Sequence, residues 1–394
     1  MSDPIVIVSA ARTPIGAMSG SFSSLAAHEL GSAAIQAAIE RAGIQPEAVD
    51  EVLMGNVLQA GQGQAPARQA ALGAGLPKNV PCTTVHKVCG SGMKTAMMGF
   101  DMLKAGSANV VVAGGQESMT NAPYLLLKAR SGYRYGNDRI FDHMALDGLE
   151  DAYEHTPMGV FAEQCVDKYG FTREEQDDYA IESLRRAREA TEKGYFEWEI
   201  TPVTVKSRRG DTVVEIDESP TRANPDRIPS LRPAFKKDGT VTAANASSIS
   251  DGAAALVLMR DSTAKELGAK PIATIVAHTQ HAHEPEWFTT APVGAIQKLL
   301  EKTGWSIEDV DLFEINEAFA CVTMAAMKDL NIPHDKVNIH GGATALGHPI
   351  GASGARIIAT LIGALRATNK KRGIATLCIG GGEAVAMAIE LADE

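Results

Sequence analysis

The sequence predicts an α/β protein built from two similar halves and a loop-rich insertion, and three observations support this fold class. The first and last thirds of the chain both alternate short β-rich runs with segments of helical apolar spacing. The run VDEVLMGN from Val49 is matched by VDLFEINE from Val310. Glycine is abundant, at 37 residues, and aromatic residues make up only 5%. This composition is typical of tight helix–sheet packing, and 394 residues exceed one ordinary core.

The first third of the chain contains four expected strands and two expected helices. The helices cover Ala26–Ala42 and Ser91–Lys104, and Gly106 ends the second. The fourth strand is almost wholly apolar, as in strands covered on both faces. The four strands are Pro4–Ser9, Val49–Val57, Pro81–His86 and Asn109–Ala113.

The last third repeats this order. Its expected strands are Pro271–Ala277, Val310–Ile315, Gly373–Ile379 and Ala384–Leu391. Its expected helices are Ala291–Lys302, Glu317–Leu330 and Gly351–Arg366. Cys89 and His348 follow the matched strands at similar intervals, and each precedes a helix. We therefore expect their loops to be equivalent and to meet across a pseudo-twofold axis.

The repeat sets the expected domain boundaries. Residues 1–117 form the first half, which a segment at about 250–270 completes, and residues 271–394 form the second half. Residues 118–249 form a loop domain that contains several prolines and the charged run ESLRRAREATEKG. Insertions of this kind often shape a substrate site or an oligomer contact.

Charge and cysteine usage exclude several classes of protein. The formal net charge is −11, which argues against nucleic-acid binding. The five cysteines are scattered and odd in number, so neither a disulfide framework nor a CxxC zinc site is expected. No apolar run approaches about 18 residues, and the N-terminus lacks a signal-peptide core. We expect a cytoplasmic protein without a membrane span and with reduced thiols.

Cys89, in VHKVCGSGMK, is a candidate nucleophile. A strand precedes it, two glycines follow, and a helix then begins. Unpaired N–H groups at a helix N-terminus stabilise a thiolate, so a lowered thiol pKa is expected. The alternative is a small buried residue that packs a strand end.

His348 and Cys378 are the next candidates. His348 lies in the glycine-rich run GGATALGHPIGASG and is either a general base or a turn histidine bonded to the backbone. Cys378, in TLCIGGGEA, ends a buried strand. The N–H groups that follow it, from Gly380 onward, could hold an oxyanion, whereas the alternative for the cysteine is core packing.

Two further motifs have competing interpretations. Asn316 either caps a helix that starts at Glu317 or holds a catalytic water. The run HTQHAH from His278 has histidine spacing that can bind a metal, but no cysteine or carboxylate supports it. We expect a solvated loop there and no metal site.

The blocks VCGSGMK, NEAFA, GHPIGASGARI and CIGGG resemble the thiolase family in order and spacing, and the resemblance extends from VIVSAARTPIG to AMAIEL. It implies two βαβαβαββ halves in a five-layer αβαβα arrangement with an inserted loop domain. It also implies that Cys89 takes the acyl group, that His348 activates Cys89, and that Cys378 is a second base. Asn316 would bind a water in one oxyanion hole, and the N–H groups of Cys89 and Gly380 would form another.

The resemblance further implies a set of residues that bind a coenzyme A thioester. Ser247 would lie near the pantetheine. The apolar contacts would be Leu149, Met158, Phe235, Ala243, Phe288, Ala318 and Phe319. The chain departs from the family pattern at Pro157, Phe288 and Glu383, and the family's adenine-packing arginine has no clear match near Pro220.

The implied activity is acetyl-CoA C-acetyltransfer, the reversible condensation of two acetyl-CoA to acetoacetyl-CoA and coenzyme A, without a further cofactor. Gly90, in CGSG, is typical of the acetyl-specific, biosynthetic branch. One alternative is a 3-ketoacyl-CoA thiolase of broader chain length. A more distant one is a non-catalytic thiolase-like binding protein. The run ESMTNAPYLLLKARSGYR resembles the family's tetramerisation loop, so a homotetramer is expected.

Overall fold

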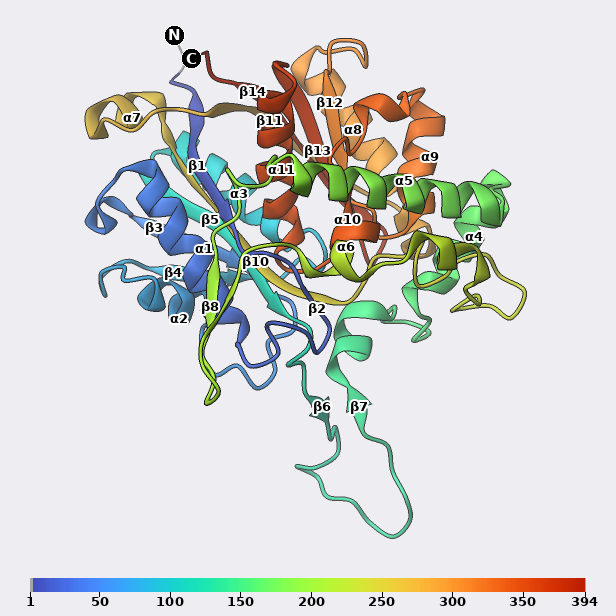
Figure 1. The fold of residues 1–394 in the computed structure, drawn as a ribbon. Helices are drawn as coiled ribbons and strands as arrows, with labels where there is room; N and C mark the ends of the chain where they lie inside the picture. The colour runs from blue at the N-terminus through green and yellow to red at the C-terminus, as the bar shows by residue number, and fades with distance from the viewer. Residues whose placement is uncertain (1–2, 394) are drawn as a thin grey trace.

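One ten-stranded sheet runs through the protein, in the order β12–β13–β14–β11–β1–β10–β5–β3–β4, with β2 paired to β10 (Figure 1). The structure is a computed structural model and describes residues 3–393. The strands of this sheet are β1 (Ile5–Arg12), β2 (Gly16–Ala17), β3 (Glu51–Gly55), β4 (Cys82–Val85), β5 (Val110–Ser118), β10 (Ser250–Arg260), β11 (Ala273–Ala282), β12 (Leu312–Ile315), β13 (Arg372–Ile379) and β14 (Glu383–Leu391).

The two halves of the chain use the same strand pattern. In the first half, β4, β3 and β5 are parallel, and β10 and β1 continue antiparallel. In the second half, β12 and β13 are parallel, and β14 and β11 continue antiparallel. Val337 forms a parallel bridge to Phe313, where a strand equivalent to β4 would lie. The halves join where β1 pairs with β11, so the predicted repeat is confirmed.

Five layers follow from the way the helices cover the sheet. Helices α3 (Ser91–Ala105) and α11 (Ser353–Ala367) lie between the two half-sheets. Helices α1 (Ala27–Ala42) and α2 (Pro66–Gly73) cover the outer face of the first half, and α8 (Ala291–Thr303) covers that of the second (Figure 1).

Strand β5 shows why two separate cores form. Val111 and Ala113 pack into the central core around α3 and α11, whereas Val110 and Val112 pack into the outer core against α1. Successive side chains of a strand point to opposite faces, so an apolar run of this kind is buried on both sides.

The first turns of α3 and α11 lie in backbone-to-backbone contact. A Cβ atom on Gly354 would lie 2.2 Å from the nitrogen of Met93, and one on Gly92 would lie 2.8 Å from the nitrogen of Ala355. Only glycine permits this approach. The contact brings together the two loops that carry Cys89 and His348.

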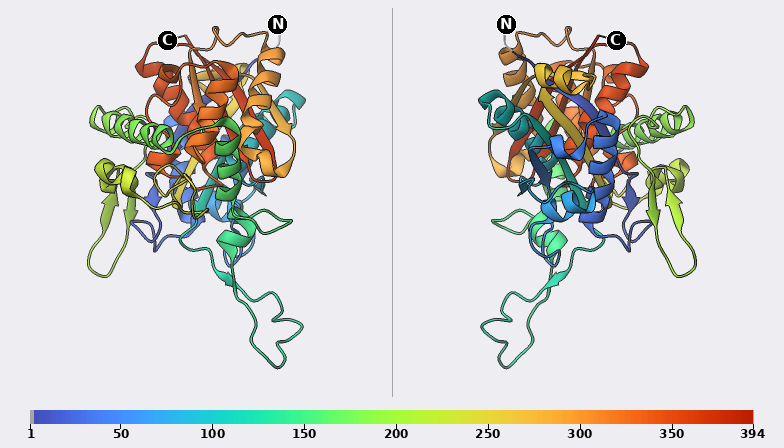
Figure 2. Two further views of the ribbon diagram at one scale, coloured as in Figure 1. Left: turned by 90° about the vertical axis from the view of Figure 1, so that its right-hand side faces the viewer. Right: turned by 90° about the vertical axis from the view of Figure 1, so that its left-hand side faces the viewer.

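The insertion leaves and returns between two neighbouring strands. β5 ends at Ser118, β10 begins at Ser250, and Ser118 pairs with Asp251. The elements between them are β6 (Tyr124–Leu125), β7 (Phe141–Asp142), the π-helix η2 (Ala145–Leu149), α4 (Met158–Tyr169), α5 (Arg173–Glu192), β8 (Val203–Val205), β9 (Thr212–Val214), α6 (Glu218–Arg222) and the 3₁₀ helix η3 (Pro225–Ser230). The segment that joins β6 to β7 projects far from the rest of the protein (Figure 2).

A buried ion network anchors the insertion to the sheet. Arg12 of β1 is fully buried, and its guanidinium donates to Asp217 at 2.7 and 2.9 Å and to Glu199 at 2.5 Å. Both carboxylates belong to the insertion. A buried cation requires such partners, because desolvation of an unpaired charge is costly.

Several expected elements have different bounds, and three of these differences affect the interpretation. Helix α9 spans Ala320–Leu330, so Glu317, Ala318 and Phe319 are not helical, contrary to the expectation. Strand β11 extends to Ala282, which places the start of the HTQHAH run in a strand and corrects the expected loop. Strand β5 extends to Ser118 rather than ending at Ala113. The remaining elements are the 3₁₀ helix η1 (Pro46–Ala48), α7 (Asp261–Leu267), the 3₁₀ helices η4 (Pro285–Thr290) and η5 (His334–Lys336), and α10 (Ala343–Leu346).

Within residues 3–393, no helix combines the length and the apolarity that a membrane crossing needs.

The substitution Gly354→Ala is expected to destabilise the protein by about 1–3 kcal/mol, because the new methyl group would meet backbone that cannot move independently. The measurement is the thermal unfolding midpoint. The matched control is Gly99→Ala in α3, where the new atom would meet only the side-chain tips of Leu258 and Val111. Equal midpoints for the two variants would contradict the conclusion that the contact between α3 and α11 is rigid.

Candidate active site

A strained elbow carries Cys89 between β4 and α3. Val88 has φ +44°, a conformation that costs a β-branched residue about 1–3 kcal/mol. Ser91 holds the elbow, because its hydroxyl accepts from the N–H of Lys87 at 2.8 Å and donates to the carbonyl of Val88 at 2.6 Å. Sequence reasoning missed this strain, since valine gives no sign of a positive φ.

The sulfur of Cys89 lies in apolar surroundings. Cys89 is half-buried and packs against the cluster that includes Met144, Ile350 and Leu149. Burial raises the pKa of its thiol to about 11, although the N–H groups of Gly380 and of Cys89 itself act in the opposite direction. The expected lowering of this pKa is therefore wrong for the resting site, because desolvation outweighs the backbone donors.

His348 is buried in the loop between α10 and α11. Its Nδ1 lies 2.5 Å from the hydroxyl oxygen of Ser353, and that hydroxyl donates to the carbonyl of Pro349 at 3.1 Å. A hydroxyl has one proton, so Ser353 must accept from Nδ1–H, and Nε2 keeps its lone pair. Burial, and then the charge of Arg356, lower the pKa of His348 to about 3. The imidazole is therefore a neutral proton acceptor.

Asn316 lies beside His348 rather than at a helix end. Its Nδ2 is 3.5 Å from Nε2 of His348. Its buried Oδ1 has no hydrogen-bond partner among the described residues. Because α9 begins at Ala320 without a side-chain cap, the capping interpretation is wrong. A buried amide oxygen of this kind is available to a water or a ligand.

Cys378 is fully buried at the end of β13. Burial raises the pKa of its thiol well above the usual range, and the negative charge of a Cys89 thiolate would raise it further. The turn that follows returns the chain into β14, with φ +99° at Gly381 and +88° at Gly382. The N–H of Gly380 in this turn reaches Cys89 from the other half of the molecule.

The residues expected to bind substrate lie along one apolar wall. The ring of Phe319 makes edge contacts with Phe235 and Phe288, at centroid distances of 6.1 and 6.4 Å. Phe288, Ala318 and Phe319 share a core cluster with Cys378, and Met158 packs against this cluster.

Three expected substrate residues lie at the edges of this wall. Ser247 donates its N–H to the carbonyl of Ala318 at 2.9 Å. Leu149 packs on the Cys89 side of the wall. Ala243 is exposed, close in sequence to Ala246, which bridges to Phe319.

Two buried carboxylates position the loops, and sequence reasoning missed both. Glu317 accepts from the hydroxyl groups of Tyr179, Ser183 and Thr344 at 2.6–2.8 Å, which ties the segment before His348 to α5. Glu117 accepts from the N–H of Gly351 at 2.9 Å. The signal was an acidic residue near the end of an apolar strand, but its partners lie far away in the sequence.

The histidine-rich run does not form a cluster. His278 bonds to Asp101 at 2.9 Å, and His281 stacks edge-on against His283. Among residues 3–393, no group of three or more histidine, cysteine, aspartate or glutamate side chains could hold a metal.

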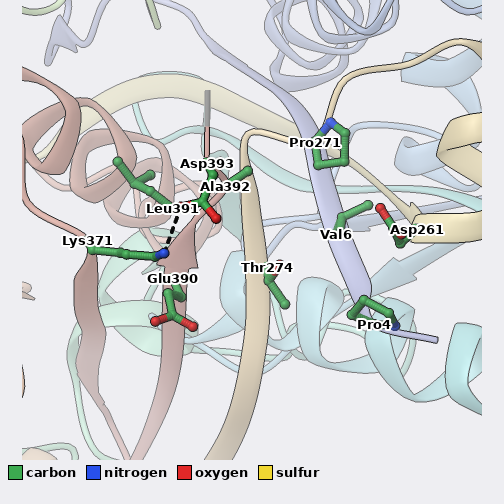
Figure 3. Close-up of a pocket in the computed structure, with 10 residues that line it drawn as sticks. All are labelled: Pro4, Val6, Asp261, Pro271, Thr274, Lys371, Glu390, Leu391, Ala392 and Asp393. Atoms are coloured by element: carbon green, nitrogen blue, oxygen red, sulfur yellow. Dashed lines mark hydrogen bonds and ion pairs between the residues drawn. The ribbon is translucent and has the colours of Figure 1, made fainter. Parts of the chain in front are cut away.

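A cavity of about 390 Å³ lies elsewhere, beside the first and last strands (Figure 3). Its lining includes Lys371, Asp261 and Glu390 and contains neither a thiol nor an imidazole. This cavity is therefore separate from the site around Cys89, since Cys89, His348 and Cys378 do not line it.

Known proteins resemble this chain over nearly its whole length. Residues 5–262 match the family model "Thiolase, N-terminal domain", and residues 269–391 match "Thiolase, C-terminal domain". Acetyl-CoA acetyltransferase 2 of Arabidopsis thaliana is 52% identical over 98% of this chain and 97% of its own length. An acetyl-CoA acetyltransferase of Allochromatium vinosum is 48% identical over 99% of this chain and 100% of its own length.

Solved structures show the same fold. Acat5 thiolase from Ascaris suum in complex with coenzyme A has a TM-score of 0.94 and 44% identity, covering 99% of this chain and 100% of its own. The Bacillus anthracis acetyl-CoA acetyltransferase has a TM-score of 0.97 and 43% identity, covering 99% of each chain.

The raised thiol pKa gives an expected pH profile. The rate of Cys89 alkylation by iodoacetamide should rise about tenfold per pH unit from pH 7 to 9.5 without a plateau, because only the thiolate reacts. Peptide mass spectrometry identifies the labelled cysteine. A plateau below pH 8 would show instead that the helix N-terminus governs the thiol.

Proposed function

The chain belongs to the thiolase family, and we propose that it is an acetyl-CoA C-acetyltransferase, which condenses two acetyl-CoA to acetoacetyl-CoA and coenzyme A in a reversible reaction. The observation that carries the proposal is that two thiols, Cys89 and Cys378, come from opposite halves of the molecule and lie close enough for a Cys89 thiolate to raise the pKa of Cys378. The relatives named acetyl-CoA acetyltransferase support the same activity.

In the first step Cys89 becomes acetylated. Nε2 of His348 takes the proton from Cys89, and the sulfur attacks the thioester carbonyl carbon. The N–H groups of Cys89 and Gly380 receive the negative charge on the carbonyl oxygen. Coenzyme A leaves as a thiolate and takes the proton of Cys378. Cys378 is then a thiolate, and His348 is an imidazolium.

In the second step a new carbon–carbon bond forms. The Cys378 thiolate removes a proton from the methyl group of a second acetyl-CoA, and the resulting enolate carbon attacks the acetyl carbon on Cys89. The enolate oxygen faces Nε2–H of His348 and a water held by Asn316. Cys89 leaves as a thiolate, and His348 returns the proton to it. Every group then has its starting protonation.

The close contact between His348 and Asn316 supports the second oxyanion site. Their nitrogens lie 3.5 Å apart, and the unpartnered Oδ1 of Asn316 is able to accept from a water. The low pKa of His348 makes its imidazolium a strong donor, and this donor forms only during turnover. No metal or cofactor takes part in these steps.

The aromatic wall supports a short acyl chain as substrate. Phe288 is 3% exposed and packs against Phe319 in the cluster that contains Cys378. A phenylalanine at this position is rigid and leaves little room for a longer chain. Gly90, which is typical of the acetyl-specific branch, also favours a short acyl chain.

The proposal includes a homotetramer in the cytoplasm. The segment between β6 and β7 projects away from the body and exposes Tyr124, Leu126, Leu127, Tyr135 and Ile140. Exposed apolar side chains of this density are typical of a contact surface. A relative from Gibberella zeae with 50% identity is named as cytosolic.

Two substitutions separate the roles of the thiols. Cys89→Ala is expected to abolish turnover and the acetyl-enzyme. Cys378→Ala should still form the acetyl-enzyme with acetyl-CoA, while condensation falls by about 10³-fold or more, because the base is missing. Intact-protein mass spectrometry measures the first property and a coupled assay the second. An unacetylated Cys378→Ala protein would count against the two roles.

Chain length separates the proposed enzyme from a broader thiolase. Thiolysis of acetoacetyl-CoA should exceed that of six- and eight-carbon 3-ketoacyl-CoA by at least about tenfold in kcat/KM. Phe288→Ala should narrow this ratio by enlarging the pocket. Comparable rates for all three substrates in the unmodified protein would favour the broader thiolase.

A further inference from the structure

We propose that the ion pair between Lys87 and Glu383 positions the two halves of the oxyanion hole around Cys89. The ammonium of Lys87 bonds to a carboxylate oxygen of Glu383. Lys87 lies two residues before Cys89, and Glu383 directly follows the glycine turn that starts at Gly380. The inference rests on the proposed function and extends it to two residues that do not touch the substrate.

The two loops come from opposite halves of the molecule and need a connection. The N–H groups of Cys89 and of Gly380 both act on the sulfur of Cys89 and favour its thiolate. Neither donor is fixed to the other by the strand ladder, because β4 and β13 lie far apart in the sheet order. Donors in such a hole must keep their geometry within about 0.5 Å to remain effective.

Apolar contacts between the loops restrict one direction of movement. A Cβ on Gly90 would lie 2.4 Å from the Ile379 side chain, so the loops cannot approach further. A contact of this kind resists compression but does not prevent separation. An ion pair supplies the attraction that opposes separation.

Glu383 is well placed to transmit this attraction to Gly380. It pairs with Ile379 across the β13–β14 turn and with Ala282 of β11. Within the turn, a Cβ on Gly382 would lie 2.5 Å from the carbonyl oxygen of His283, so the turn has little freedom. The attraction between Lys87 and Glu383 is therefore transmitted through this restricted turn to Gly380.

The backbone around Lys87 is also held in place. Its N–H donates to Ser91, which also holds the strained Val88. The side chains of Lys87 and Glu383 are 19% and 37% exposed, so solvent screens the ion pair in part. We therefore assign Lys87 and Glu383 as positioning residues and not as catalytic ones.

The test compares five variants. Lys87→Met and Glu383→Gln remove the ion pair, Lys87→Glu places two carboxylates together, and the double variant Lys87→Glu with Glu383→Lys reverses the pair. Lys371→Met is the matched control, because it removes an exposed ion pair to Asp393 that is remote from Cys89. The measurements are kcat and KM for acetoacetyl-CoA thiolysis, the alkylation rate of Cys89 at pH 9, and the thermal midpoint.

Removal of the pair should lower kcat about tenfold with little change in KM, since misplaced donors weaken the transition state and not the ground state. Loss of the Gly380 donor should raise the thiol pKa, and a rise of half a unit lowers alkylation about threefold. The reversed pair should recover at least about threefold in kcat relative to Lys87→Glu alone. Lys371→Met should match the unmodified protein in all three measurements.

An unchanged kcat and an unchanged alkylation rate in Lys87→Met would overturn the proposal. A reversed pair whose kcat does not exceed that of Lys87→Glu would overturn it as well. A fall in the thermal midpoint alone, without a change in kcat, would show a purely structural role and would also overturn it. Absence of thiolysis in the unmodified protein would refute the proposed function instead. Alkylation at Cys89, which needs no turnover, would still decide the role of the pair.

Discussion

The first turns of α3 and α11 meet at Gly92 and Gly354 with no side chain between them, and the position of every reacting group depends on this contact. The same surface extends into the sheet, because a Cβ on Gly115 would lie 1.9 Å from the carbonyl oxygen of Gly351. The loop of His348 is thereby pressed against strand β5 of the other half. The distance between the loops of Cys89 and His348 is therefore set by backbone packing and not by adjustable side chains.

The burial that this packing creates also determines the charges. In the resting site Cys89 and Cys378 are thiols and His348 is a neutral imidazole, because desolvation disfavours each charged form. In the proposed reaction, negative charge develops only after a substrate binds. The fixed N–H donors then face the charged oxygen. Burial also raises the pKa of Glu117, to about 7, and the oxygens of Glu117 and Glu317 accept the hydrogen bonds that hold the loops in place.

The sequence predicted most of the fold because its signals are local. Periodicity located α1, α3, α8 and α11 within two residues at either end, and the apolar run at Val110 identified a strand covered on both faces. The positive φ of Val88, the late start of α9 and the partners of Glu317 were not predictable. Each depends on contacts between segments distant in the chain. The raised pKa of Cys89 was missed because burial is a property of the whole fold.

The duplicated scaffold has lost its chemical symmetry. When the starts of α3 and α11 are matched at Ser91 and Ser353, Gly351 stands opposite Cys89, His86 opposite His348 and Gln116 opposite Cys378. The first copy alone carries the proposed nucleophile Cys89, and the second alone carries the proposed base Cys378, whereas a histidine stands at the equivalent place in both. A symmetric dimer of either half alone would lack one of these functions. Because both halves belong to one chain, every molecule contains one Cys89 and one Cys378.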